Sequence, residues 1–126
     1  MRICIDLDGV IASFKKEGES YLDVAPIKGA REKMQSLKEA GHYLIIHTAR
    51  HMKTCEGNVG KVVARQGSAT LEWLAKHEIP YDELFFGKPW AEVYIDDNAY
   101  RFESWEKVGS NGEGLPKHAE KVAKGE

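Results

Sequence analysis

Apolar runs alternate with amphipathic stretches over most of the chain. Arg2–Asp8 is a run of apolar and β-branched residues that leads into two acids, which is typical of a buried strand. Lys28–Ala40 places apolar residues at helical spacing before Gly41, so we expect an amphipathic helix there. Tyr43–Ala49 is again continuously apolar. The order strand, helix, strand predicts a parallel pair with a right-handed crossover.

The second half of this pattern predicts one more helix and two short strands. Arg50–Gly67 is polar, rich in glycine and lysine, and without a sustained period, so we expect mainly a long loop. Ala69–His77 has the apolar spacing of a second helix. Leu84–Phe86 and Val93–Ile95 are apolar runs that each lead into polar residues, and we expect both to be strands. The pattern as a whole predicts an α/β domain.

The last part of the chain differs in composition from the rest. Beyond Trp105 few large apolar residues occur, so we expect a domain over residues 1–105 and a tail over residues 106–126. A short helix is expected to begin near Pro116. A length of 126 residues, of which 42% are hydrophobic and 30% charged, is typical of one globular domain.

Charge and cysteine content exclude several classes of protein. The 18 basic and 20 acidic residues leave a net charge of -2, which argues against extended nucleic-acid binding. No apolar stretch is long enough to span a membrane. Two acids interrupt the N-terminal apolar run, whereas a signal peptide needs an uninterrupted apolar stretch there. We therefore expect a cytoplasmic protein with no membrane partner. Cys4 and Cys55 are too few for a disulfide scaffold or a four-thiolate zinc site, and both should be reduced.

Polar residues follow each of the four expected strands. Because the carboxyl ends of parallel strands share one edge of a sheet, we expect these residues to converge. Four carboxylates in one place repel each other unless a cation compensates, and an all-oxygen donor set suits Mg²⁺. Phosphate oxygens would fill the open positions of that ion, which favours phosphoryl chemistry on a small phosphorylated substrate. The residues are Asp6 and Asp8, Thr48, Lys88, and Asp96 and Asp97.

In content and order these motifs resemble the haloacid dehalogenase (HAD) superfamily of aspartate-nucleophile phosphatases. The matching pieces are DLDGV at Asp6–Val10, an apolar strand ending in threonine at Ile45–Thr48, GKP at Gly87–Pro89, and IDD at Ile95–Asp97. Within the superfamily, IHTARHMKTCEGNVGK and WLAKHEIPYDELFFGKPW are similar to small phosphatase-like proteins encoded with capsular polysaccharide biosynthesis. The resemblance covers roughly Met1–Arg101.

The resemblance implies a three-layer Rossmann-like (HAD-like) fold with a mostly parallel sheet, and it implies catalytic roles for four residues. Asp6 would attack phosphorus and form an aspartyl-phosphate. Asp8 would protonate the leaving oxygen and then deprotonate the attacking water. Thr48 would donate to the phosphoryl oxygens, and Lys88 would neutralise charge on the nucleophile and the phosphate.

The same resemblance implies Mg²⁺ as the cofactor. Its ligands would be Asp6, the backbone carbonyl of Asp8, and the pair Asp96 and Asp97, directly or through water. We favour Asp97 as the direct ligand of that pair, although the sequence leaves the choice open.

Substrate contacts are expected from the polar segment after the second strand. Arg50 and Lys61 would place positive charge beside the crevice, and Arg50 is expected to contact the phosphate or another anionic group. Gly9 and Ala49 are further candidates for substrate binding. The short connection from Asp8 to the first helix leaves no room for a cap domain, so selectivity would come from loops or from a neighbouring subunit in a homo-oligomer.

Nearby histidines and a tryptophan have simpler explanations. His47 and His51 have the spacing of a zinc pair, but His47 lies on an expected strand and no third ligand is evident, which favours structural roles. Trp90 could stack on a sugar or base, although packing is the better explanation.

The sequence therefore predicts a Mg²⁺-dependent phosphomonoester hydrolase, and the resemblance favours a sugar phosphate or a related polysaccharide intermediate as its substrate. A nucleotide or nucleic-acid-end phosphatase is an alternative of the same class. A phosphoaspartate receiver domain is an alternative of a different class, but such domains place the paired acids before the phosphoacceptor strand, whereas here DLD comes first and DD last.

Overall fold

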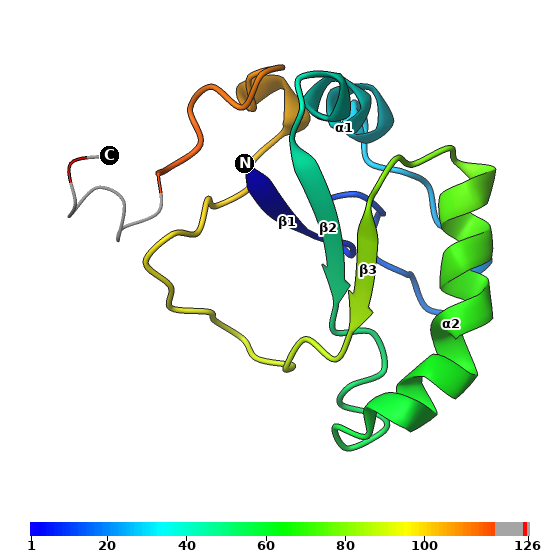
Figure 1. Cartoon of the computed structure of the whole chain (residues 1–126). Coiled ribbons are helices and arrows are strands. Elements are labelled where there is room, and N and C mark those ends of the chain that lie inside the picture. Colours follow the sequence, from blue (N-terminus) through cyan, green and yellow to red (C-terminus); the bar gives the residue numbers. More distant parts are fainter. Residues whose placement is uncertain (118–124, 126) are drawn as a thin grey trace.

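The computed structural model shows a parallel sheet flanked by helices, and it describes residues 1–117 and 125 (Figure 1). The 3-stranded sheet has the order β1-β2-β3, with β1 at Arg2–Asp6, β2 at Tyr43–Thr48 and β3 at Glu83–Phe86. Asp6 pairs with His47, and Thr48 pairs with Phe86. The carboxyl ends of all three strands therefore lie at one edge of the sheet.

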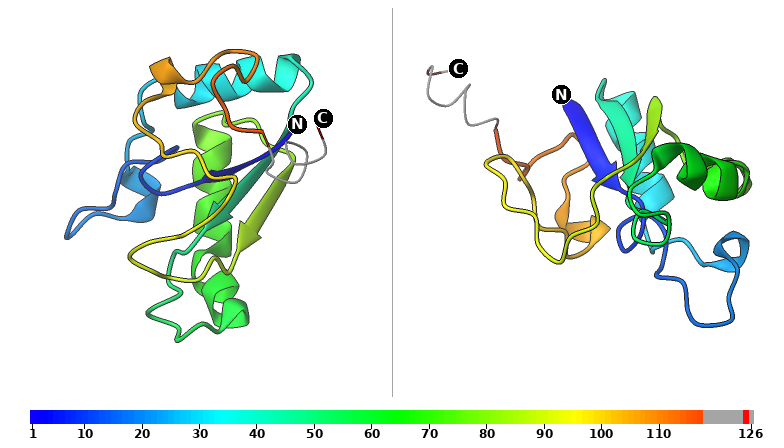
Figure 2. Two further views of the ribbon diagram at one scale, coloured as in Figure 1. Left: turned by 90° about the vertical axis from the view of Figure 1, so that its left-hand side faces the viewer. Right: turned by 90° about the horizontal axis from the view of Figure 1, so that it is seen from below.

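The strands are joined by two helical crossovers. Helix α1 (Ala30–Glu39) packs against β2, and helix α2 (Val59–Lys76) packs against β3 and against the short 3-10 helix η1 (Tyr21–Asp23). Figure 2 shows the sheet from two further sides, with α2 running along it. This is the expected α/β, Rossmann-like architecture, and residues 1–117 contain no separate cap.

The core lies between the sheet and the helices. Alternate residues of β2 are buried, as a strand with one face on the core requires. Trp73 is fully buried, and its indole Nε1 donates to the carbonyl of Val24 at 2.9 Å, which ties α2 to the segment after η1. The other fully buried large side chains include Leu7, Ile11, Met34, Leu37, Leu44, Ile46 and Leu74.

Helix α2 begins earlier than the sequence pattern predicts. The expected helix was Ala69–His77, whereas the observed one starts at Val59, so the preceding loop is shorter than expected. Asn58 caps the helix, because its side-chain oxygen accepts from the backbone N–H of Lys61 at 3.0 Å. The added turns bury few large side chains apart from Val62, so they carry little hydrophobic period.

The prediction of a fourth strand at Val93–Ile95 is wrong. Among the described residues, the sheet contains three strands, and Val93–Ile95 is not one of them. Val93 is 72% exposed and Ile95 is 99% exposed, on a segment that loops away from the sheet on the side opposite α2 (Figure 1). An apolar triplet forms a strand only when it has a hydrogen-bonded neighbour and a surface to cover, and this segment has neither.

Packing continues beyond residue 105. The 3-10 helix η2 (Trp105–Lys107) buries Trp105, whose indole Nε1 donates to the carbonyl of Val10 at 2.7 Å. Val108 is also buried, and its carbonyl accepts from the ammonium of Lys33. The helix expected near Pro116 falls on residues 118–124, outside the described residues.

The described part of the chain contains no helix that is both long enough and apolar enough to cross a lipid bilayer.

Candidate active site

A tight turn at the end of β1 carries the first two acids. The backbone N–H of Leu7 donates to the carbonyl of His47 at 3.1 Å, so the strand pairing extends one residue past Asp6. Gly9 then takes a positive φ of 86°, and its N–H donates to the carbonyl of Ala12 at 2.7 Å. Such a φ strains any residue with a Cβ, so the turn itself requires glycine at position 9, independently of any substrate binding.

Asp6 lies beside Lys88. The ammonium Nζ of Lys88 is 3.5 Å from Oδ2 of Asp6, while the backbone N–H of Leu7 donates to Oδ1 at 3.0 Å. Lys88 is brought here because its own N–H donates to the carbonyl of Thr48 at 3.2 Å, which joins the segment after β3 to the end of β2. Burial raises the pKa of Asp6, and the Lys88 ammonium opposes that rise. The Asp6 side chain remains 38% exposed, so a ligand can reach it.

Asp8 is held by a buried arginine. The guanidinium Nε of Arg50 donates to Oδ1 and Oδ2 of Asp8 at 3.0 and 3.1 Å, and Nη2 lies 2.9 Å from Oδ1. The Arg50 side chain is only 1% exposed. Its expected contact with a substrate phosphate is therefore not what the structure shows, because the guanidinium is committed to Asp8 inside the protein.

Thr48 also faces Asp8. Its hydroxyl donates to Oδ2 of Asp8 at 3.3 Å and accepts from the backbone N–H of Arg50 at 3.0 Å. Thr48 is fully buried at the end of β2. A hydroxyl has one proton to donate, and here Asp8 accepts it, so the expected donation to a phosphoryl oxygen stays a prediction.

Two residues that the sequence analysis missed hold Arg50 from its other sides. Its Nη1 donates to the hydroxyl of Thr70 at 3.3 Å, and its guanidinium carbon lies 4.2 Å from the ring centroid of Tyr21. Thr70 is a fully buried hydroxyl, three residues before Trp73 on the buried face of α2, and that position was a usable signal. Nothing in the sequence around Tyr21 indicates its role.

The side chains of the remaining expected substrate residues take no part in the contacts between Arg50 and Asp8, although Ala49 lies between Thr48 and Arg50 in the chain. Lys61 is exposed in the first turn of α2, and its backbone N–H is used in the helix cap. Ala49 accepts from the N–H of Met52 within the loop. Burial and the nearby cations Arg65 and Arg50 lower the pKa of His51, so its charged form is disfavoured.

The segment after Lys88 is open to solvent. Trp90 is 50% exposed with the ammonium of Lys53 4.6 Å from its ring centroid, so the expected packing role is wrong. The ring of Tyr94 lies 4.2 Å from the Lys88 ammonium, and its hydroxyl donates to the carbonyl of Pro89. Asp97 follows on the same exposed segment.

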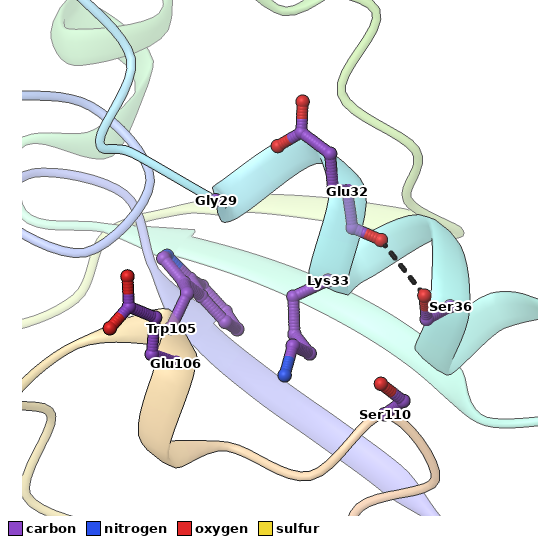
Figure 3. Close-up of a pocket in the computed structure, with 7 residues that line it drawn as sticks. All are labelled: Gly29, Glu32, Lys33, Ser36, Trp105, Glu106 and Ser110. Carbon is purple, nitrogen blue, oxygen red and sulfur yellow. Dashed lines mark hydrogen bonds between the residues drawn. The ribbon is translucent and has the colours of Figure 1, made fainter.

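A separate hollow lies between α1 and η2, away from the acids. It has a volume of about 290 Å³ and none of the expected site residues among its lining side chains (Figure 3). Glu32, Lys33, Glu106 and Trp105 line it, and Lys33 is already bound to the carbonyl of Val108. The hollow offers no convergent set of catalytic groups.

Comparison with solved structures places the chain in a family. A structural genomics target from Vibrio cholerae is 34% identical, with a TM-score of 0.74, and the match covers 98% of this chain and 95% of that one. The chain belongs to the family of that Vibrio protein. A chain of the Pnkp1/Rnl/Hen1 complex has a TM-score of 0.51 at 20% identity over 77% of this chain and 30% of that one, which shows a shared fold alone. No family model matches, and no curated protein matches.

The structure does not bring the expected magnesium ligands on Asp6, Asp8, Asp96 and Asp97 together. Asp6 is paired with Lys88, and the Asp8 carboxylate is bound by Arg50 and Thr48. In the described part of the chain, no three His, Cys, Asp or Glu residues are grouped so as to hold a metal ion. Asp96 and Asp97 lie on the exposed segment, where Oδ1 of Asp96 accepts from the N–H of Asp97 at 2.8 Å. The donor set therefore does not fit Mg²⁺ in this arrangement.

Proposed function

We propose that this protein hydrolyses phosphate monoesters through an aspartyl-phosphate formed on Asp6, as the resemblance to the HAD superfamily implies. One observation carries the proposal. Residues from three separate motifs meet at the carboxyl edge of the sheet, where Lys88 lies 3.5 Å from Asp6 and Thr48 contacts Asp8. A carboxylate nucleophile, a second carboxyl group and an ammonium at one open edge are the parts that phosphoryl transfer needs.

The first step forms the covalent intermediate. A carboxylate oxygen of Asp6 attacks phosphorus, and the bond from phosphorus to the leaving oxygen breaks. Protonated Asp8 gives its proton to that oxygen, so the product leaves as an alcohol. Lys88 supports this step in two ways, because its ammonium favours the ionised form of Asp6 and attracts the negative phosphoryl group.

The second step regenerates the protein. A water molecule attacks the phosphorus of the aspartyl-phosphate, and Asp8, now ionised, takes the proton of that water. The bond between phosphorus and the Asp6 oxygen breaks, which releases inorganic phosphate and restores both acids to their starting states. The double use of Asp8 requires its carboxyl group to face the same point in both steps.

The proposed hydrolysis depends on Mg²⁺, and only the resemblance of the motifs supports this part of the proposal. The IDD motif at Ile95–Asp97 is the basis for expecting Mg²⁺, and a metal site there would require Asp97 to leave its present exposed position. None of the steps above is assigned to the ion. Phosphate release measured with Mg²⁺ and with EDTA tests the dependence directly.

The proposed substrate is a sugar phosphate or a related polysaccharide intermediate, since the resemblance to capsule-associated proteins favours that class. The described residues provide no cap, so a substrate of this size would enter from solvent. A nucleotide or nucleic-acid-end phosphatase is the alternative of the same class. The likeness to a chain of the Pnkp1/Rnl/Hen1 complex does not choose between them, because it shows the fold alone.

The test is phosphate release from a panel of sugar phosphates, nucleotides and p-nitrophenyl phosphate, with wild type and Asp6→Asn in parallel. We expect wild type to release phosphate and Asp6→Asn to lose all measurable turnover. Glu39→Gln changes an exposed carboxylate at the end of α1 to an amide and serves as the matched control. Equal rates for wild type and Asp6→Asn would contradict the proposal. A stable phosphoaspartate without turnover would favour the receiver-like alternative.

A further inference from the structure

Arg50 carries a permanent charge into the protein interior. Its side chain is 1% exposed, and burying a guanidinium is costly unless another charge and hydrogen-bond acceptors meet it. Asp8 supplies the charge and accepts from Nε at 3.0 and 3.1 Å, and its Oδ1 lies 2.9 Å from Nη2, which has no hydrogen-bond partner among the described residues. The arrangement therefore commits a buried cation to a single carboxyl group at the open edge of the sheet.

The guanidinium itself is fixed from two other elements. Thr70 on α2 accepts from Nη1 at 3.3 Å, and the ring face of Tyr21 on η1 lies 4.2 Å from the guanidinium carbon. Helix α2 and η1 pack against each other, and the Trp73 indole bond to Val24 reinforces that contact. Arg50 can therefore not turn away from Asp8 without disturbing this packing.

Arg50 also acts on Asp8 through its own backbone. Its N–H donates to the hydroxyl of Thr48 at 3.0 Å, and that hydroxyl donates to Oδ2 of Asp8 at 3.3 Å. Both oxygens of Asp8 are thus held by the short segment from Thr48 to Arg50. A carboxyl group that must deliver a proton and later collect one gains rate from such a fixed orientation.

We propose that Arg50 is the positioning residue for Asp8 and that Thr70 and Tyr21 hold Arg50 in place. This inference rests on the proposed phosphatase function, and it replaces the expectation that Arg50 contacts the substrate. Arg50 would then act on the proton transfer to the leaving oxygen, and it would leave substrate affinity nearly unchanged.

Leaving-group dependence separates this role from general loss of structure. A sugar alkoxide leaves poorly and needs the proton of Asp8, whereas p-nitrophenolate is a weak base and leaves without help. A misplaced Asp8 should therefore slow the first step, which kcat/KM reports, far more for a sugar phosphate than for p-nitrophenyl phosphate. The second step, which kcat also includes, is the same for both substrates. A partly unfolded protein would lose both activities by the same factor.

The experiment compares kcat and KM for p-nitrophenyl phosphate and for the sugar phosphate that wild type hydrolyses fastest. For Arg50→Lys we expect kcat/KM, which reports the first step, to fall about 100-fold for the sugar phosphate and less than about 5-fold for p-nitrophenyl phosphate. Arg31→Lys is the control, because Arg31 is an exposed arginine on α1 that pairs with its neighbour Glu32.

Thr70 provides a second pair of variants that keeps the fold. Thr70→Val preserves the shape and removes the acceptor for Nη1, and we expect about a 5-fold loss of kcat/KM on the sugar phosphate with a smaller loss on p-nitrophenyl phosphate. Thr70→Ser restores the hydroxyl and should restore most of that activity. If Arg50→Lys fails to fold, which circular dichroism shows, the Thr70 pair decides the question.

Two results would overturn the inference while wild type remains active and Asp6→Asn inactive. One is an equal loss of kcat/KM on both substrates, and the other is a raised KM with unchanged kcat, which would make Arg50 a substrate contact. Absence of phosphate release by wild type from every compound would instead overturn the proposed function, and the role of Arg50 within it.

Discussion

Asp6 and Asp8 stand two positions apart at the end of β1, yet they have different surroundings. Asp6 is half-exposed beside a lysine whose ammonium is 3.5 Å away. Asp8 faces a buried arginine and a buried threonine. At the scale of single residues, one acid is left accessible and the other is fixed, which matches the division between a nucleophile and a proton carrier in the proposed function.

The Lys88 ammonium opposes the effect of burial on Asp6, so its removal should raise the pKa of Asp6 further. We expect carbon-13 NMR titration of the Asp6 carboxyl group in Lys88→Met to show a midpoint at higher pH than in wild type. Lys76→Met, at the exposed end of α2, is the control and should leave the midpoint unchanged. A midpoint that moves down or stays in place in Lys88→Met would contradict the assigned ion pair.

The raised pKa of Asp6 also predicts how stability depends on pH. An acid whose pKa is higher in the folded state than its ordinary value of 3.8 favours folding while it is protonated, and that contribution is lost as the pH rises through the folded value. Asp6→Asn removes this titration. Urea unfolding should therefore show Asp6→Asn gaining stability relative to wild type from pH 3 to pH 7. A relative loss over that range would show that Lys88 outweighs burial.

At the scale of elements, the site depends on where α2 begins. The helix starts at Val59 behind the Asn58 cap, and Thr70 on its buried face accepts from Arg50. The sequence pattern located the second half of α2 through Trp73 and Leu74, because those side chains are buried and periodic. It missed the first half, because a cap and exposed residues define that part and neither produces a hydrophobic period.

Loss of the cap should weaken α2. Asn58→Ala leaves the N–H of Lys61 without its acceptor, and we expect the free energy of unfolding to fall by about 1 kcal/mol in urea denaturation. Asn58→Asp keeps an acceptor at the same position and should be close to wild type. An Asn58→Ala protein as stable as wild type would mean that the helix starts later, as the pattern alone suggested.

At the scale of the whole molecule, the fold could be predicted more completely than the site. The three strands and α1 follow from apolar runs and their order, since burial on a sheet leaves a strong pattern. The motifs correctly brought Asp6, Asp8, Thr48 and Lys88 to one edge. The partners of Arg50 were out of reach, because Tyr21 and Thr70 meet it only through tertiary packing. At Val93–Ile95 the sequence predicted a strand that does not form, because these residues have high strand propensity but no neighbouring strand to pair with.

Two tryptophans of the domain differ in burial and should differ in their effect on stability. Trp105 is 4% exposed and its indole is bound to Val10, so we expect Trp105→Ala to lower the free energy of unfolding by about 3 to 5 kcal/mol. Trp90→Ala removes a half-exposed ring and should change it by less than about 0.5 kcal/mol. Thermal and urea unfolding measure both. Equal, small effects would contradict the packing of Trp105 into the core.

The hydrogen bond between Trp105 and Val10 joins residues 95 positions apart, and this bears on how the chain folds during synthesis. Domains begin to fold from the N-terminus as the ribosome releases them. A nascent chain that has already delivered all three strands still lacks the indole that anchors the turn following Asp8. Contacts between such distant positions form late, because a long loop must close first. We therefore expect the acid-bearing turn to be among the last parts of the protein to become rigid, after the sheet beneath it is complete.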